Sequence, residues 1–384
     1  MIAPDVLVVG AGPAGSVAAL VLARAGVRVR LVDRAAFPRD KLCGDTLNPG
    51  TMSMLDRLGV GAAIRQRALP ITGMEITGPD GVTVSADYPG VLRGAALIRR
   101  DLDRLLVEAA ANAGVTFDSG VTVRGALLSG PNDQVAGVRA AVGSTPCDVR
   151  ARLVIAADGR ASKLAAAAGL SRFAHAPKRW AFGAYFGDVA GMSARGEMHV
   201  RRGSYVGVAP LPGGIVNVCV VTDSAERPRG RMGPADTIAS VLRSDPALRD
   251  RFARARQLSP VTTLGPLAVD AIGAGRPGLL LAGDAAGFID PMTGDGMRFA
   301  IRGGELAALA ALDELTSGSP AHAQLWAARR REFGSKWRLN RGLRVLVDSP
   351  RATRVAARLS RRWGAPVRLL VRLAGDVHLV RDAS

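Results

Sequence analysis

The sequence has little cysteine, few aromatic side chains and no long apolar run. Its three cysteines lie far apart and form no C-x-x-C pair, so neither a zinc site nor a thioredoxin-like site is indicated. The four histidines show no ligand spacing, and we expect no bound metal. No apolar run reaches the roughly 18 residues that a membrane-spanning helix needs. The sparse, odd cysteine count is typical of a reducing compartment, so we expect a cytoplasmic protein.

Lysine is scarce as well, since only four of the 51 basic residues are lysine. The net charge of +18 suggests nucleic acid, but aromatic residues make up 4% of the chain and offer few surfaces for base stacking, so we expect no such partner. Residues 329–384 carry 15 basic and four acidic residues, which is +11 of the net charge. We expect this region to be helical. Its apolar residues either pack on the rest of the chain or make a peripheral contact with anionic lipid at the inner face of the membrane.

A glycine-rich motif, GAGPAG, begins at Gly10 and follows Val6–Val9, a run typical of a buried parallel strand. In a strand–turn–helix unit, Gly10 permits the tight turn, Gly12 lets a pyrophosphate approach the backbone, and Gly15 lets the helix pack on the strand. The amides at the helix N-terminus attract phosphate. Asp33 ends the next apolar run, where a carboxylate can bind a ribose hydroxyl. The pattern predicts a dinucleotide site without separating NAD from FAD.

A second glycine-rich turn lies far downstream, in the segment LAGDAAGFIDPMTGDGM over 281–297. An apolar strand is expected to end at its Gly-Asp pair, which places Asp284 to bind a ribityl hydroxyl. The amides near Gly294–Met297 precede an expected helix, and they can face the edge of a flavin ring where negative charge develops on reduction. Between the two turns, AADGRAS over 156–162 follows another apolar strand.

Taken in order over about residues 1–310, these motifs resemble the FAD-binding fold of the p-hydroxybenzoate hydroxylase superfamily. The segment that begins at Arg99 is similar to that family's R-x-x-F-D-x-x-L element, whose arginine approaches the cofactor. In the family the DG pair is tied to both FAD and NAD(P)H, which implies Asp158 and Gly159 here. The resemblance implies bound FAD, with NADH or NADPH as a transient reductant.

Within this superfamily, the loop FPRDKLCGD over 37–45 resembles the geranylgeranyl reductase branch, which has a Cys-Gly pair at this position. The segment YVGVAP is in register with that branch's Y-x-W-x-F-P element, whose two aromatic residues shape a prenyl channel. Gly207 and Ala209 replace them, so the cavity should be wider by roughly a few hundred Å³ at most. Cys43 either relays a proton near the flavin or is a small buried hydrophobic residue, and Asp45 beside it could face substrate.

The sequence predicts an α/β fold: a Rossmann-like FAD-binding domain, an inserted α+β substrate domain with a mainly antiparallel sheet, and a helical C-terminal tail. We expect the FAD-binding domain at 1–65, 95–165 and 270–315, the substrate-binding domain at 66–94 and 166–269, and the arginine-rich helical region at 316–384. The expected FAD-binding residues are Gly10, Gly12, Pro13, Ala14, Gly15, Asp33, Arg34, Cys43, Gly44, Arg99, Asp158, Gly159, Gly283, Asp284, Pro291, Gly294, Asp295, Gly296 and Met297. The expected pocket residues are Tyr185, His199, Tyr205, Gly207 and Ala209, and the catalytic candidates are Cys43, Asp45 and Tyr205.

Three functions are compatible with these motifs. We favour a monooxygenase, which would use NAD(P)H and oxygen to hydroxylate a lipophilic aromatic or polyketide-like molecule, because a broad cavity suits a ring. The alternative is reduction of C=C bonds in a prenyl chain, which the FPRDKLCGD loop favours. The third is a non-catalytic, basic binding protein that contains flavin, although amides aimed at a developing flavin anion indicate redox chemistry.

Overall fold

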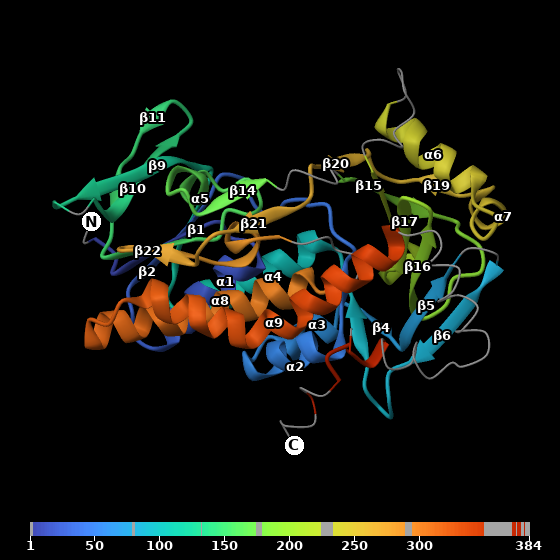
Figure 1. Ribbon diagram of the computed structural model, residues 1–384, viewed down its shortest axis with the longest axis horizontal. Helices are drawn as coiled ribbons and strands as arrows, with labels where there is room; N and C mark the ends of the chain where they lie inside the picture. The colour runs from blue at the N-terminus through green and yellow to red at the C-terminus, as the bar shows by residue number, and fades with distance from the viewer. Residues whose placement is uncertain are drawn as a thin grey trace.

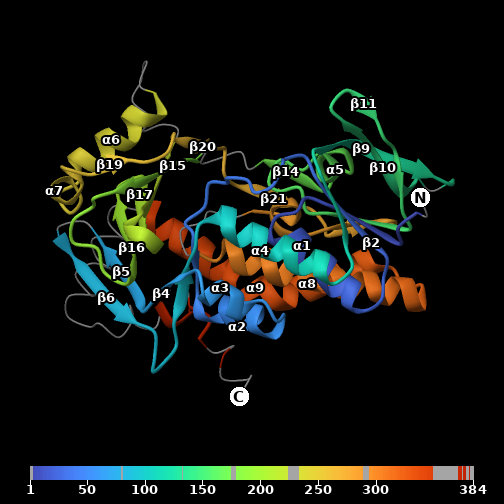
Figure 2. The same cartoon turned by 180° about the vertical axis from the view of Figure 1, so that it is seen from behind.

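The computed structural model describes residues 3–78, 81–131, 133–173, 179–223, 233–288, 294–348, 371–373, 375–377 and 380. A largely parallel sheet forms one end of the molecule and a second large sheet forms the other (Figure 1). Long helices run along one side, and Figure 2 shows them from behind. The expected fold class, an α/β fold with a sheet-rich second unit, is confirmed.

The first sheet is built from short apolar strands that lie far apart in the sequence. Its strands are β1 (Val6–Val9), β2 (Val29–Asp33), β8 (Thr116–Ser119), β13 (Leu153–Ala156), β22 (Gly275–Arg276) and β23 (Leu279–Leu281). The order is β22-β23-β13-β1-β2-β8, and all neighbours are parallel except the pair β22–β23. Every residue of β1 and β13 is buried, because both faces of the sheet are covered. The carboxyl ends of the parallel strands therefore meet at one edge, where all three motifs begin.

Helices cover one face of this sheet, and a small antiparallel sheet covers the other. One core contains side chains of α1 (Pro13–Arg24), α2 (Pro49–Arg57), α3 (Gly61–Arg65), α4 (Arg99–Asn112), α8 (Gly296–Ser317) and α9 (Ala321–Asp348). The opposite core contains side chains of β9 (Val121–Ser129), β10 (Gln134–Val142), β12 (Val149–Arg150) and α5 (Lys163–Ala167), and β11 (Thr145–Pro146) pairs with β10. The predicted hairpin that uses 134–142 is thus present.

The second large sheet has eight strands. They are β5 (Gly73–Thr77), β6 (Thr83–Asp87), β15 (Arg179–Gly187), β16 (Arg195–Arg201), β17 (Ser204–Pro210), β18 (Val216–Asp223), β19 (Arg256–Gln257) and β20 (Thr262–Leu264). The order is β19-β15-β18-β17-β16-β5-β6, with β20 also on β15, and only β16–β5 is parallel. Helices α6 (Pro234–Ser244) and α7 (Arg249–Phe252) pack on one face through apolar side chains. The other face is left to wall a cavity.

Short elements connect the two large sheets. They are a three-stranded sheet of β3 (Thr46–Leu47), β4 (Leu69–Ile71) and β7 (Gly94–Ala96), a pair of β14 (Ser171–Phe173) and β21 (Val269–Ala271), and the 3-10 turns η2 (Pro212–Gly214) and η3 (Gly283–Ala286). The strands of the parallel sheet come from three separate stretches of chain, as the discontinuous domain predicts. The domain boundaries themselves stay predictions.

The described part of the arginine-rich tail packs on the rest of the chain. Leu325 and Phe333 of α9 are fully buried in the helical core, and Trp326 and Trp337 pack against it. Lys336 is buried too, and its ammonium lies 2.8 Å from a carboxylate oxygen of Asp295. We considered that these apolar residues either pack on the rest of the chain or contact lipid; the residues named here pack on the rest of the chain. Among the helices of the described ranges, none has both the length and the apolar character that a bilayer span requires.

Close packing of α1 on α8 provides a stability prediction. A Cβ at Gly304 would lie 2.2 Å from the carbonyl oxygen of Ala14, and backbone cannot give way as a flexible side chain can. Gly304→Ala should lower the free energy of unfolding by about 1–3 kcal/mol through overpacking. Gly334→Ala, in α9 where the added Cβ meets nothing within 4 Å, should raise it by about 0.5–1 kcal/mol. Thermal unfolding of both variants tests this, and equal melting temperatures would contradict it.

Candidate active site

The first glycine-rich turn joins β1 to α1, and the neighbouring backbone leaves no space for a side chain at two of its glycines. Gly10 has φ +99°, and a Cβ there would lie 2.3 Å from the carbonyl oxygen of Ala157 at the end of β13. A Cβ at Gly15 would lie 1.8 Å from the carbonyl oxygen of Gly10. A Cβ at Gly12, by contrast, would meet only the Arg39 guanidinium, at 3.5 Å. Gly10 and Gly15 thus permit close packing, while the backbone at Gly12 stays accessible at the helix N-terminus.

Asp33 is held rigidly at the end of β2. One carboxylate oxygen accepts a hydrogen bond from the Ala11 amide at 2.8 Å, and the other accepts from the Ala35 amide at 2.9 Å. Each oxygen has a second lone pair for a ribose hydroxyl. Asp33 and Arg34 both line the cavity, together with 121–123 of β9. This end of the cavity can hold an adenosine.

The cavity has a volume of about 480 Å³ and runs along the edge where the parallel strands end. It brings together most of the residues predicted from sequence. Those that line it are Gly10, Gly12, Pro13, Ala14, Asp33, Arg34, Cys43, Gly44, Arg99, Asp158, Gly159, Gly283, Asp284, Gly294, Gly296, Met297, Tyr205, Gly207 and Ala209. A Cβ at Gly294 or Gly296 would meet none of the described residues within 4 Å, so this part of the second turn leaves room for a ligand.

Charged side chains line the middle of the cavity. Lys41 is half-buried, and among the described residues neither an ion pair nor a hydrogen bond engages its ammonium. Burial lowers the pKa of Lys41, because the charged form loses water. Asp158 has a buried Oδ1 without a hydrogen-bond partner in the described chain. Arg99 reaches the cavity, although its guanidinium is held by Asp103 through two hydrogen bonds of 3.0 Å.

The far end of the cavity is walled by the second large sheet. Tyr205, Gly207 and Ala209 alternate along β17 on the cavity face, and Asn217 and Cys219 do so on β18. A Cβ at Gly207 would meet only the Cys219 carbonyl oxygen, at 3.9 Å. There is therefore room at this position for a large side chain or for substrate.

Two of the catalytic candidates lie in the loop between the two sheets. Cys43 lines the cavity, and burial raises the pKa of its thiol. Asp45 is 2% exposed and has φ +54°, and its carboxylate accepts hydrogen bonds from Tyr185 Oη (2.9 Å), Asn217 Nδ2 (2.5 Å) and the Arg99 amide (3.2 Å). Burial raises the pKa of Asp45 to about 6, against the opposing effect of these donors. The loop therefore holds an acid that titrates near neutral pH.

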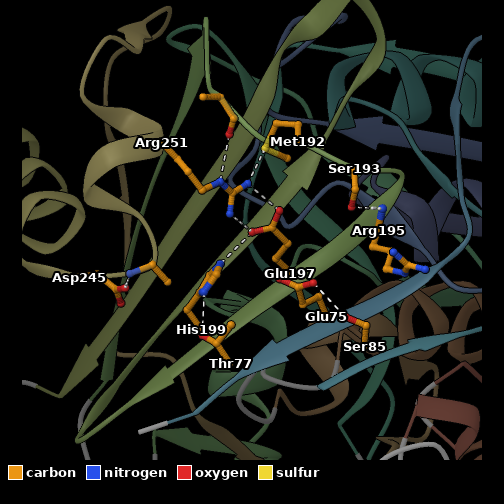
Figure 3. Close-up of polar contacts among 12 residues, drawn as sticks. Glu75, Thr77, Ser85, Met192, Ser193, Arg195, Glu197, His199, Asp245 and Arg251 are labelled. Atoms are coloured by element: carbon orange, nitrogen blue, oxygen red, sulfur yellow. Dashed lines mark hydrogen bonds and ion pairs between the residues drawn. The ribbon is translucent and has the colours of Figure 1, made fainter. Parts of the chain in front are cut away.

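The prediction that His199 faces substrate is wrong. Successive residues of a strand point to opposite faces, and His199 pairs in register with Val206, which belongs to the core under α6 and α7. Its ring nitrogens lie 2.8 Å from Thr77 Oγ1 and 2.9 Å from Glu197 Oε2, and Arg251 binds that Glu197 carboxylate (Figure 3). His199 thus belongs to a buried polar cluster on the far face of the sheet.

Four further residues were predicted for the site. Tyr185 does not line the cavity, because its hydroxyl turns to Asp45. The Asp295 carboxylate turns to Lys336 instead of the cavity, and Gly15 serves packing. Pro291 lies outside the described residues. Asn217 was not predicted, although its place on the strand expected at 215–221, on the same face as Cys219, is a signal that could have found it.

Comparison with known proteins decides the family. A model described as an FAD binding domain matches residues 3–336. The chain belongs to this FAD-binding family. It is 30% identical to a menaquinone reductase of Mycobacterium tuberculosis, over 97% of this chain and 91% of that protein. It is 28% identical to a digeranylgeranylglycerophospholipid reductase of Methanosarcina mazei, over 87% of this chain and 80% of that protein.

Solved structures show a similar fold. The flavin-dependent halogenase CmlS superposes with a TM-score of 0.78 at 26% identity, over 88% of this chain and 63% of that chain. The predicted membership of the superfamily, on the geranylgeranyl reductase-like branch, is confirmed. The protein is an FAD-dependent oxidoreductase.

The residues present fit FAD. The open backbone at Gly12 and the N-terminus of α1 can take the pyrophosphate. Lys41, whose ammonium has no ion-pair or hydrogen-bond partner in the described part of the chain, adds a positive charge in the same cavity. The unpartnered Asp158 oxygen and Asp284 can accept from hydroxyl groups, and the open turn at 294–296 can hold the ring. FAD supplies two-electron chemistry as a hydride acceptor and donor.

Lys41 provides a binding prediction. Lys41→Met keeps most of the side-chain length but removes the charge, so it should weaken FAD binding by about 10- to 100-fold, as expected for a lost charge-assisted contact of about 1.5–3 kcal/mol. Arg67→Met removes one exposed charge outside the cavity and should leave the affinity unchanged. Titration of the flavin-free protein with FAD measures both dissociation constants. Equal constants for Lys41→Met and the parent protein would contradict the assignment.

Proposed function

We propose that the protein reduces C=C bonds in the isoprenoid chain of a quinone-like lipid, with NADH or NADPH as the source of electrons. The observation that carries this proposal is that the apolar end of the cavity lies beside the Cys43 thiol, a group that can give a proton. Reduction of a double bond needs a hydride for one carbon and a proton for the other. FAD, when bound, would be the source of the hydride, so the chain's own residues would have to hold and deliver the proton.

The apolar end of the cavity suits a hydrocarbon chain. Its lining includes Met74, Met198, Leu264, Leu267 and Phe288, beside the small residues of β17. A flexible chain gains affinity from such surface through the hydrophobic effect. The space left by Gly207 and Ala209 would take a ring or a branched portion of the same molecule. This combination favours a chain attached to a ring over a plain chain.

The proton donors lie at the boundary between cavity and loop. Cys43 lines the cavity with a thiol whose pKa is raised by burial, so it stays protonated at neutral pH. Asp45 lies two residues further along the loop, is bound by the same Asn217 amide as the Cys43 carbonyl oxygen, and has a pKa raised to about 6. An acid works best when its pKa lies near the operating pH. Cys43, which lines the cavity, would pass its proton to substrate, and Asp45, whose pKa lies near the operating pH, would return the proton to Cys43.

The activities for which similar proteins are named agree with a reduction. Two proteins similar over most of this chain are named for the reduction of menaquinone and of a digeranylgeranyl lipid. We extend these activities to the present chain as a proposal. A lipophilic substrate would also suit peripheral contact with a membrane.

The same space at Gly207 favours a second candidate. Hydroxylation of an aromatic or polyketide-like molecule would need oxygen as a co-substrate and a cavity broad enough for a ring. This is the function that the sequence favours, and it stays a prediction. A purely binding role would leave the flavin unreduced by NADH or NADPH.

Anaerobic turnover separates these functions. With menaquinone as the probe and NADH or NADPH as reductant, we expect turnover without oxygen and a product heavier by two hydrogens for each bond reduced. Mass spectrometry measures this gain after air has oxidised any quinol in the extract back to the quinone, so that only hydrogen added to the chain remains. A gain of one oxygen that vanishes under anaerobic conditions would establish the monooxygenase instead. Flavin that neither nucleotide reduces would leave only the binding role.

The cavity wall predicts a change in specificity. Gly207→Trp should fill the space opposite Cys219, and should lower kcat/KM for menaquinone by about 10- to 100-fold if crowding costs about 1–3 kcal/mol. Geranylgeraniol, which has the chain without the ring, should lose much less. Ser335→Trp places the same side chain on an exposed position of α9 as a control. Equal losses for both substrates would show that the space does not hold the ring.

A further inference from the structure

A hydrogen-bonded cluster connects the cavity wall with the outside of the protein. Tyr185 and Asn217 are cross-strand neighbours in β15 and β18, and both donate to Oδ2 of Asp45, at 2.9 and 2.5 Å. Asn217 also donates to the carbonyl oxygen of Cys43 at 2.9 Å. Two strands of the second sheet thus hold a loop that belongs to the flavin side.

The members of the cluster differ in exposure. Asp45 is 2% exposed and does not line the cavity, whereas Cys43 and Asn217 on either side of it do. Tyr185 is only half-buried, and it interacts electrostatically with Asp40 and Arg100, which form an exposed ion pair. The order from solvent to cavity is therefore Tyr185, Asp45 and then Cys43.

A role in holding the loop accounts for Asn217 but not for Tyr185. Asn217 by itself would fix the loop, because it binds both Asp45 and Cys43. The Tyr185 hydroxyl adds a group that can donate and accept a proton at once, placed between a buried carboxyl and solvent. A buried carboxylate without a task is costly, since burial disfavours its charged form.

We propose that Tyr185 and Asp45 relay protons from solvent to the Cys43 thiol, and so restore the proton donor after each reduction. Tyr185 and Asp45 are positioning and relay residues, and Cys43 is the group that faces substrate. This inference rests on the proposed reduction of C=C bonds, and it adds the route of the proton.

The proton balance of one cycle is as follows. A hydride from the reduced cofactor adds to one carbon of the double bond with its electron pair, and the Cys43 thiol gives its proton to the other carbon. The resulting thiolate takes a proton from the Asp45 carboxyl. The Asp45 carboxylate then takes the proton of the Tyr185 hydroxyl as that hydroxyl takes one from water. Each double bond thus consumes one hydride and one solvent proton, and the protein returns to its starting state.

The electrostatics agree with this direction. Burial raises the pKa of Cys43, and the charge of Asp45 adds to this effect, against the opposing charge of Arg99. A thiolate there therefore takes a proton from an acid that titrates at about 6. The groups that face Asp45 are Tyr185, Asn217, Cys43 and Arg99. Arg99 is the only cation among these described groups, and Asp103 binds its guanidinium. Asp45 is protonated below its pKa, so a rate that depends on this acid should fall as pH rises through about 6.

The first test needs no substrate. In the FAD-loaded protein, the infrared carbonyl band of a protonated carboxyl is followed against pH, and Asp45→Asn identifies the component that belongs to Asp45. We expect a midpoint near 6. Tyr185→Phe removes a donor that favours the carboxylate, so the midpoint should rise by about one unit. Tyr88→Phe, which removes a buried phenol outside the cavity and the cluster, should leave it unchanged.

The second test uses anaerobic turnover of menaquinone. Tyr185→Phe should lower kcat about tenfold with KM unchanged, should enlarge the solvent deuterium isotope effect, and should move the basic limb of the kcat profile with the infrared midpoint. Asp45→Asn should lower kcat further, and Asp45→Glu should restore part of it. Tyr88→Phe should behave as the parent protein does.

The two proposals fail in different ways. Turnover of Tyr185→Phe equal to that of Tyr88→Phe, together with an unmoved infrared midpoint, would overturn the relay while the reduction stands. Absence of double-bond reduction in the parent protein would overturn the proposed function and the relay with it, and the infrared midpoints would then report only a structural contact between Tyr185 and Asp45.

Discussion

The carboxylate of Asp45 joins the two halves of the active site. It accepts from the Arg99 amide, at the start of a helix that packs under the parallel sheet, and from Tyr185 and Asn217 on the second sheet. A buried carboxylate is tolerated only when such donors replace water. The backbone pays for this geometry with a positive φ at Asp45, a conformation that L side chains rarely adopt. The relative position of cavity wall and nucleotide site therefore depends on this carboxylate together with Asn217, which also binds the carbonyl oxygen of Cys43.

The same constraint explains the chemistry of the loop. Residues 41–44, next to Asp45, all line the cavity. The Lys41 ammonium lies near Gly159 of the DG pair, whereas the Cys43 carbonyl oxygen accepts from Asn217 of the second sheet. One loop thereby carries a cation suited to phosphate and a thiol suited to proton transfer. Substitutions that loosen Asp45 would disturb both functions together, even though Asp45 itself does not line the cavity.

The nucleotide-binding half could be predicted well from sequence, because its signals are local. Gly15 is required because it packs against the backbone of Gly10, five residues earlier, and Gly10 because it packs against the residue that follows β13. Asp33 is the last residue of β2, where its carboxylate binds the Ala11 amide. The substrate half depends on contacts between distant segments. Asp45 and Tyr185 are 140 residues apart, and no local pattern indicates that they meet. His199 was misplaced because a strand offers two faces, and only the register with Val206 decides which one is buried under helices.

The arginine-rich tail shows how composition can mislead. Its charge suggests a surface, yet Lys336 is buried between Asp295 and Asp376, at 2.8 and 3.0 Å. Asp295 precedes α8 in the second glycine-rich turn, and Asp376 also pairs with Arg298 near the start of that helix. A buried cation that bridges two buried carboxylates is favourable only while all three remain in place, because removal of one leaves an uncompensated charge. Lys336 and Asp376 therefore support the turn that is expected to hold the flavin ring. The Asp295 carboxylate was predicted to bind the cofactor; it instead fixes the backbone of this turn, whose amides would bind the flavin ring.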